Sequence, residues 1–322
     1  MEILYEDNAG GLIGCCDIIN ISNSYSTAKV IANGGTFDNF VGGLIGTANS
    51  NIKVIDCYAT GEVTGLNYLG GLIGLIGDTS YISDTQAVID TCYATNTVKG
   101  QDNVGGLIGY VNIENCIINS CYVTDGTISG RNNVGGFAGI IQSNAEVSNS
   151  YTKNITVEAD GNNVGGIVGL NHGYMENCQS SGTVKGTDNV GGVVGFNECI
   201  EYKYWPSVSR TESECNVEGQ NNIGGIIGHN TSSMESCKAS GTITGQNKVG
   251  GVIGFLDNSA NSGAGAYYLE SKCTVTGYDY VGGVIGHNLE GDYDYLIFDN
   301  VTVNGDVPGH THNDIGYDER EI

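Results

Sequence analysis

Hydrophobic and polar positions alternate along this chain in short runs rather than with helical spacing. The apolar runs are rich in Val, Ile and Tyr, and clusters of Gly, Asn and Asp separate them. β-Branched and aromatic residues favour strands, whereas Gly and Asx residues favour tight turns. The apolar positions show no sustained period of 3.6 residues. The pattern therefore predicts an all-β chain of short strands and sharp corners.

A Gly-Gly pair marks each copy of an internal repeat. An apolar residue precedes each pair by one position and an Asn or Asp precedes it by three, while two apolar residues and a further Gly follow it. We interpret the Asx residues as turn formers. Ten copies span 272 residues, or about 30 residues per copy, and their pairs begin at Gly10, Gly42, Gly70, Gly105, Gly135, Gly165, Gly191, Gly224, Gly250 and Gly282.

A repeat of about 30 residues accommodates three short strands and three turns, which is one coil of a parallel β-solenoid. We therefore predict a right-handed parallel β-helix of about ten coils, forming a rod of roughly 50 Å. Residues 1–304 are expected to form a single β-solenoid domain with an inserted loop at 196–215. Residues 305–322 are expected to form an acidic, polar C-terminal tail.

The repeat resembles the GLUG repeat family, whose core appears here as Gly-Leu-Ile-Gly at residues 43–46, 71–74 and 106–109. The resemblance covers the chain from about residue 5 to residue 290. It implies a bacterial or archaeal surface or secreted protein, such as an adhesin, in which the repeats form stalks or binding surfaces. It implies no catalytic residues.

Equivalent residues of a solenoid stack into columns. One column comprises Cys57, Cys92, Cys121, Ser150, Cys178 and Cys237 and is expected to face inward, mostly as free thiols, because parallel stacking leaves the Cβ atoms too far apart for a disulfide. The next column should therefore face outward. Its aromatic members form either a stabilising ladder or an exposed stripe that contacts a glycan or a protein, and they are Tyr25, Tyr58, Tyr93, Tyr122 and Tyr151.

Two further slots leave alternatives open. Strict alternation would expose the residue after each Gly pair, such as Leu72 or Leu107, unless the Gly pair bends the chain and turns this residue inward. An Asn column at Asn171, Asn197, Asn230 and Asn288 is expected to hydrogen-bond along the stack. His229 and His287 lie two coils apart, which is too far for joint metal ligation.

The longest departure from the repeat contains three aromatic residues, Tyr202, Tyr204 and Trp205, beside acidic residues. Loops that project from a repeat scaffold often carry recognition. These residues are candidates for binding a sugar or a basic protein, the alternative being a loop that packs its own aromatic residues on the rod.

Composition narrows the possible partners. The 36 acidic and 12 basic residues give a formal charge of −24, which argues against binding to nucleic acid or to an anionic membrane. No stretch is long and apolar enough for insertion into a membrane, and no cofactor or metal ligand set is recognisable. Gly makes up 52 of 322 residues, yet the 39% of apolar residues exclude collagen-like or disordered sequence.

These observations predict a non-enzymatic structural or adhesive protein outside the cell or on its surface, either an adhesin stalk or a subunit of a filament or sheath. It is expected to self-associate end to end or laterally and to contact a glycan or a neighbouring surface protein. The alternative is a polysaccharide-binding or polysaccharide-degrading β-helix. Degradation would need paired carboxylates or a basic residue near carboxylates in a cleft, and no acid in the sequence is bracketed by Arg and Lys. Ice binding is disfavoured because Thr residues fall irregularly along the sequence.

Overall fold

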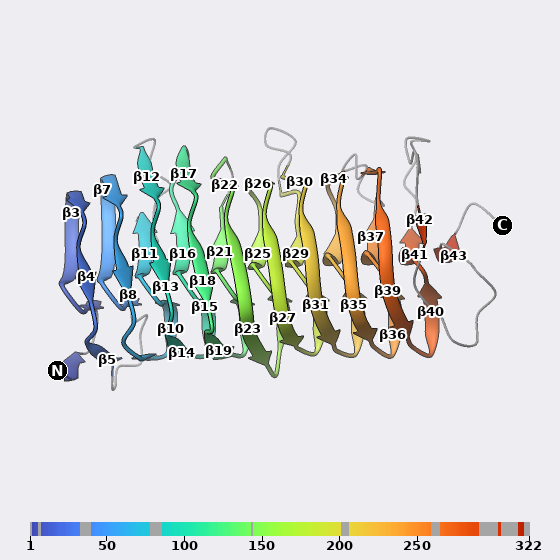
Figure 1. Cartoon of the computed structure of the whole chain (residues 1–322), viewed down its shortest axis with the longest axis horizontal. Coiled ribbons are helices and arrows are strands. Elements are labelled where there is room, and N and C mark those ends of the chain that lie inside the picture. The colour runs from blue at the N-terminus through green and yellow to red at the C-terminus, as the bar shows by residue number, and fades with distance from the viewer. Residues whose placement is uncertain are drawn as a thin grey trace.

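The chain folds into a row of stacked β-coils with its two ends at opposite ends of the row (Figure 1). The computed structural model describes residues 2–5, 8–32, 40–77, 86–142, 144–200, 206–258, 265–289, 302–303 and 315–318. Every strand pairing in these segments is parallel and joins one coil to the next. The predicted class, an all-β parallel β-solenoid, is therefore confirmed.

One sheet is built from the Gly-Gly motifs. Its ten strands are joined by nine turns of the solenoid, slightly fewer than the ten coils expected. The apolar residue before each pair, such as Val104 or Val134, points inward and is fully buried. The strands are β2 (Asn8–Gly10), β6 (Phe40–Gly42), β10 (Asn67–Gly70), β15 (Asp102–Gly105), β20 (Asn132–Gly135), β24 (Asn162–Gly165), β28 (Asp188–Gly191), β32 (Asn221–Gly224), β36 (Asn247–Gly250) and β40 (Asp279–Gly282).

A second, 15-stranded sheet carries the Tyr column and is called the ladder sheet. In its first coils the chain is split into two short strands, whereas from β23 to β39 it runs as one continuous strand of 7 to 9 residues in each coil. The strands are β1 (Glu2–Tyr5), β4 (Tyr25–Ser26), β5 (Lys29–Ala32), β8 (Tyr58–Ala59), β9 (Val63–Thr64), β13 (Tyr93–Ala94), β14 (Thr97–Lys99), β18 (Tyr122–Thr124), β19 (Thr127–Gly130), β23 (Tyr151–Ala159), β27 (Gln179–Lys185), β31 (Glu212–Glu218), β35 (Lys238–Thr244), β39 (Glu270–Thr276) and β42 (Thr302–Val303).

The remaining strands follow the Gly pairs and close each coil. They are β3 (Ile13–Ser22), β7 (Ile45–Ile55), β11 (Ile73–Gly77), β12 (Ala87–Asp90), β16 (Ile108–Asn112), β17 (Cys116–Asn119), β21 (Ala138–Ile141), β22 (Glu146–Ser148), β25 (Val168–Asn171), β26 (Tyr174–Glu176), β29 (Val194–Asn197), β30 (Ser207–Ser209), β33 (Ile227–Asn230), β34 (Ser233–Glu235), β37 (Ile253–Asp257), β38 (Ala266–Tyr267), β41 (Ile285–Leu289) and β43 (Ile315–Asp318). The core is one continuous apolar column enclosed by these strands and the two sheets.

The Gly pair bends the chain, which settles the alternative left open for the residue that follows it. Between β10 and β11, the amides of Leu72 and Ile73 both donate to the carbonyl of Leu107 in the next coil, at 2.8 and 3.0 Å. Both side chains are consequently buried. A Cβ on Gly71 would lie 1.9 Å from the carbonyl oxygen of Gly106, so the bend requires glycine. At the first coil, by contrast, Leu12 is 54% exposed.

The Asx slot precedes a left-handed residue by one position. Positive φ values occur at the residue after the Asx slot, for example 60° at Asn103 and 52° at Asn133, and these residues lie in the strands β15 and β20 together with Asp102 and Asn132. Asn tolerates this conformation better than other non-glycine residues because its short side chain bonds locally. The amide of Asn133 also donates to Asn103 in the preceding coil at 2.8 Å.

Two segments treated separately in the sequence contain paired strands. Within 196–215, the strands β29, β30 and the start of β31 continue the solenoid, so the departure from the repeat lies between Asn197 and Ser207. Within 305–322, β43 pairs in parallel with β41, and Ile315 lies opposite Ile285.

Candidate functional site

The Tyr column forms a stacked ladder on the outside of the ladder sheet. Successive ring centroids of Tyr25, Tyr58, Tyr93, Tyr122 and Tyr151 are 4.7 to 5.0 Å apart, and neighbouring rings are within 8° of parallel. This spacing equals the distance between adjacent strands, so the backbone register sets the stack. An inner ring such as Tyr93 has a neighbouring ring against each face.

The Cys column lies beneath this ladder and is fully buried, as the alternation predicted. All 11 cysteines are free thiols. The Sγ of Cys121 lies 3.2 Å from the carbonyl of Asn119 and accepts the amide of Cys92 at 3.3 Å. Burial raises the pKa of the Cys178 and Cys237 thiols to about 12, so these sulfurs stay protonated near neutral pH and act as packing groups.

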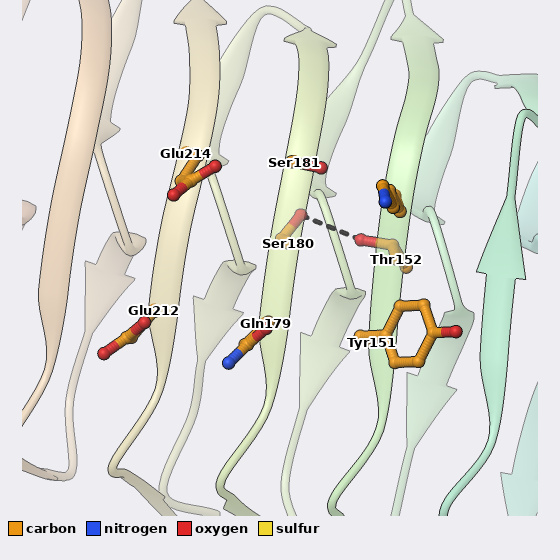
Figure 2. Close-up of a pocket in the computed structure, with 8 residues that line it drawn as sticks. Tyr151, Thr152, Gln179, Ser180, Ser181, Glu212 and Glu214 are labelled. Atoms are coloured by element: carbon orange, nitrogen blue, oxygen red, sulfur yellow. Dashed lines mark hydrogen bonds between the residues drawn. The ribbon is translucent and has the colours of Figure 1, made fainter.

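Tyr151 ends the ladder, because the next coil has Gln179 in the same slot. One face of the Tyr151 ring therefore lacks a tyrosine neighbour. In Figure 2 its hydroxyl points away from Gln179 and Glu212, which continue the row on the other side. The structure thus brings together the four tyrosines predicted from the sequence as candidate binding residues, which are Tyr58, Tyr93, Tyr122 and Tyr151. Tyr151 differs from the other three because Gln179, and not a tyrosine, lies beside it in the next coil.

A shallow hollow of about 200 Å³ begins at this ring. A second hollow of about 270 Å³ shares Glu212 and Glu214 with the first and extends as far as Glu270 and Lys272 on β39. Together they form a polar groove, which crosses β23, β27, β31, β35 and β39. The residues of the first hollow are Tyr151, Thr152, Lys153, Gln179, Ser180, Ser181, Glu212 and Glu214.

The groove exists where the ladder sheet has continuous strands. Its inward-facing floor is fixed by buried hydroxyls. The Thr152 hydroxyl donates to the carbonyl of Gly166 at 3.0 Å. It is also hydrogen-bonded to the hydroxyl of Ser180 at 2.9 Å (Figure 2). A register shift between Thr152 and Ile155, together with the positive φ of 138° at Gly182, bends the chain at this point. The outward side chains on either side of the bend then line the groove.

Charges in the far half of the groove are paired. Glu212 lies 3.7 Å from Lys238, and Glu270 lies 2.7 Å from Lys272. The hydrogen bond from Lys272 lowers the pKa of Glu270 below its usual range. In the near half, Lys153 and Glu214 form no ion pair with any other described residue. The near half therefore presents one free cation and one free anion.

The aromatic candidates of the insertion, Tyr202, Tyr204 and Trp205, lie outside the described residues. The start of this segment is anchored, since His172 is bonded through Nδ1 to Gln142 at 3.0 Å and through Nε2 to Glu198 at 2.8 Å. This bond lowers the pKa of the Glu198 carboxyl, so the group is held as an anion beside a buried imidazole.

The Asn column is confirmed as a buried hydrogen-bonded stack at Asn171, Asn197 and Asn230, whereas Leu256 separates Asn288 from them. Asn171 donates to Asn197, and Asn197 donates to Asn230, each at 2.8 Å. The slot next to it holds a mixed aromatic stack, in which the rings of Phe196, His229, Phe255 and His287 lie 4.4 to 5.1 Å apart. The sequence pattern drew attention to the two histidines but not to the stack, although Phe196 and Phe255 occupy the equivalent slots.

The Thr residues fall irregularly along the sequence but form a regular column in the fold, so the prediction of an irregular arrangement was wrong. Thr97, Thr127, Thr156 and Thr183 are paired directly in the ladder sheet, and Thr242 is paired with Thr274. Asn216 interrupts the column between them. Unequal insertions hide this column in the sequence. The distance from one coil to the next at this slot, with Asn216 included, varies from 26 to 33 residues.

Ion pairs join neighbouring coils beside the Thr column. Lys185, which lies two positions after Thr183, pairs with Glu218 of the next coil at 2.8 Å. In the segments that the structure covers, no group of three His, Cys, Asp or Glu residues is arranged to hold a metal ion. Within those same segments, no helix is long and apolar enough to cross a membrane.

The comparisons with known proteins identify the repeat. The family model described as the GLUG motif matches residues 160–185 and 219–244. The first match spans β24 to β27 and the second spans β32 to β35, so the family unit is one coil. No curated protein and no solved structure was found to match the chain. The chain is therefore similar to the GLUG-motif family at these two coils, and the other coils repeat the same slots.

Proposed function

We propose that the protein is a non-enzymatic structural and adhesive rod, located on the cell surface or outside the cell. It would serve as an adhesin stalk or as a subunit of a filament or sheath. The observation that supports this most is the continuity of its columns. Buried Asn, Cys and aliphatic slots continue from coil to coil, and each residue in them is used for packing or for bonding between coils.

The surroundings of the acidic residues support a non-enzymatic role. Glu212 and Glu270 lie on an exposed sheet face beside lysines, where solvent screens their charges. Glu198 is bonded to His172, and the pKa of its carboxyl is lowered, which is opposite to the raised pKa of a general acid in glycoside hydrolysis. Turnover of an acidic glycan that disappears in Glu198→Gln would contradict this part of the proposal.

The proposed partners are further copies of the chain and a glycan or a neighbouring surface protein. Nucleic acid is not among them, because the formal charge is −24 and several of the basic residues lie beside acids, as Arg131 lies beside Asp102. Ladders of this kind provide a stiff scaffold whose outward slots face a partner at regular intervals.

Electron microscopy of the purified chain, combined with immunogold labelling of the cells that produce it, tests this proposal. We expect either uniform short rods, which indicate a stalk, or filaments built from them, with gold particles on the cell surface or outside it. Label confined to the cytoplasm would contradict the proposed location. Irregular aggregates without rods would contradict the structural role.

A further inference from the structure

We propose that the near half of the polar groove is a binding subsite for one pyranose ring of a neutral glycan chain. The subsite lies between Tyr151 and Glu214. The inference deepens the adhesive part of the proposed function and rests on it. It locates the contact on the ladder sheet, at the point where the tyrosine ladder ends.

The free ring faces of the tyrosine ladder limit where a sugar can bind. A sugar packs its apolar face against an aromatic ring, so it needs a face that no other ring covers. Tyr58, Tyr93 and Tyr122 each have parallel rings on both sides at about 5 Å and offer only their edges. The ladder therefore has two free faces, one at each end, on Tyr25 and on Tyr151.

The two end rings of the ladder differ because Tyr151, and not Tyr25, borders the groove. Tyr25 is 59% exposed, but neither hollow of the groove includes it. Tyr151 borders a hollow of about 200 Å³, which is smaller than the roughly 300–1,000 Å³ of sites for drug-sized ligands. The hollow thus suits a single ring, and the second hollow continues it along the rod for the rest of a chain-like ligand.

Polar and charged side chains line the hollow that Tyr151 borders. Gln179 offers an amide donor and acceptor, Ser181 a hydroxyl, Lys153 an ammonium and Glu214 a carboxylate. Neither charge is engaged in an ion pair with another described residue. Donors and acceptors therefore surround the ring face on several sides, as the hydroxyl groups of a pyranose require.

The charges also select the class of ligand. Glu212 and Glu214, in a protein of formal charge −24, disfavour an acidic glycan. Lys153 stands at the Tyr151 end, where a lysine or arginine side chain from a basic peptide would have to lie. A neutral ligand satisfies both charges by hydrogen bonding without an opposing repulsion.

The test uses the full chain and neutral linear tetrasaccharides of β-1,4-glucose, β-1,4-N-acetylglucosamine and α-1,4-glucose, titrated by calorimetry and by saturation-transfer NMR. We expect at least one of them to bind and Tyr151→Ala to weaken that binding about tenfold. Tyr93→Ala and Tyr25→Ala are the matched controls, an inner ring and the other terminal ring, and both should bind as the wild type does. Equal losses in all three variants would overturn the subsite.

Two further variants keep the test decisive if Tyr151→Ala is unstable. Gln179→Ala changes an exposed side chain and should weaken glycan binding without changing the unfolding temperature. Lys153→Ala should also weaken glycan binding, whereas stronger binding of a lysine-rich peptide to this variant would assign the groove to a basic partner and overturn the proposal. Failure of every tetrasaccharide to bind the wild type would overturn the subsite while leaving rods and surface location, and hence the structural role, intact.

Discussion

Asn197 lies in the middle of a buried column in which each amide group depends on the next. It accepts a hydrogen bond from Asn171 and donates one to Asn230, both at 2.8 Å. A buried polar group that loses its partner costs about 1–3 kcal/mol, because water cannot replace the lost bond. Such columns therefore stabilise the register between coils as well as the fold.

Replacement of Asn197 by Leu should lower the free energy of unfolding by about 2–4 kcal/mol, because two buried neighbours lose a partner. The shape itself is tolerated, since Leu256 occupies the equivalent slot and is fully buried. Urea denaturation measures the difference. Asn49→Ala, which breaks an exposed bond to Asp17, is the control and should change stability by less than about 0.5 kcal/mol. Equal effects would contradict the role of the buried column.

His287 makes stability depend on pH. Burial, together with the nearby Lys248, lowers its pKa from an ordinary value of 6.5 to about 4. Between these values the unfolded chain binds the proton and the folded chain does not, so stability must fall as the pH falls from about 6.5 to about 4. The effect is absent at higher pH, where His287 is neutral in both states.

The variant His287→Phe should remove this part of the pH dependence, because Phe255 already occupies the same slot one coil earlier. Thermal unfolding of both proteins between pH 4 and pH 8 provides the measurement. The melting temperature of the wild type is expected to fall further than that of the variant below about pH 6.5. Parallel curves over the whole range would show that His287 is not kept neutral.

At the scale of one element, the corner that follows each Gly pair is the most demanding part of the coil. A Cβ on Gly136 would lie 2.1 Å from the carbonyl oxygen of Gly166 in the next coil. Gly65 precedes the Gly pair that begins at Gly70. The nearest atom to a Cβ on Gly65 would be a methyl group of Val41 at 3.0 Å. Backbone cannot move aside as a side chain can, so the two slots should respond differently.

We expect Gly136→Ala to destabilise the protein by at least about 3 kcal/mol and Gly65→Ala by about 1 kcal/mol or less. Chemical denaturation of both variants tests this difference. A Gly136→Ala protein as stable as Gly65→Ala would mean that the coils are not packed as closely as the corner geometry requires.

The sequence predicted those elements whose slots recur at fixed distances from the Gly pair. The alternation of Cys92 and Tyr93 correctly placed one side chain inside and one outside. The left-handed position was not located from the sequence, because Asp102 and Asn103 are both Asx residues, and only backbone angles distinguish them. The groove was not predicted, because it depends on a register shift near Ile155 and on the positive φ of Gly182, and neither can be read from the order of residues. One sequence feature does mark the position of the groove: Gln179 replaces tyrosine in the slot of the tyrosine ladder.

At the scale of the whole molecule, the rod separates two kinds of surface. The early coils of the ladder sheet carry stacked aromatic rings, whereas the later coils carry polar and charged rows. Most charged rows are neutralised between neighbours, as in Lys29 with Glu62 and Lys185 with Glu218. Exposed pairs of this kind contribute little to stability, so their effect is to balance charge along the rod.

The central claim is that each repeat forms one coil and that equivalent residues stack in register along the rod. Pulsed electron paramagnetic resonance between spin labels in the Thr column tests this most directly. The labels are attached through an introduced keto amino acid, so that the native cysteines stay unmodified. Thr97 is five coils from Thr242 and six coils from Thr274.

With a rise of about 4.8 Å per coil, we expect distances of about 24 Å for the pair Thr97 and Thr242 and about 29 Å for the pair Thr97 and Thr274. The difference of about 5 Å is the decisive quantity, because label linkers affect both pairs equally. A second distance that is equal to or shorter than the first would contradict the solenoid and the columns built on it.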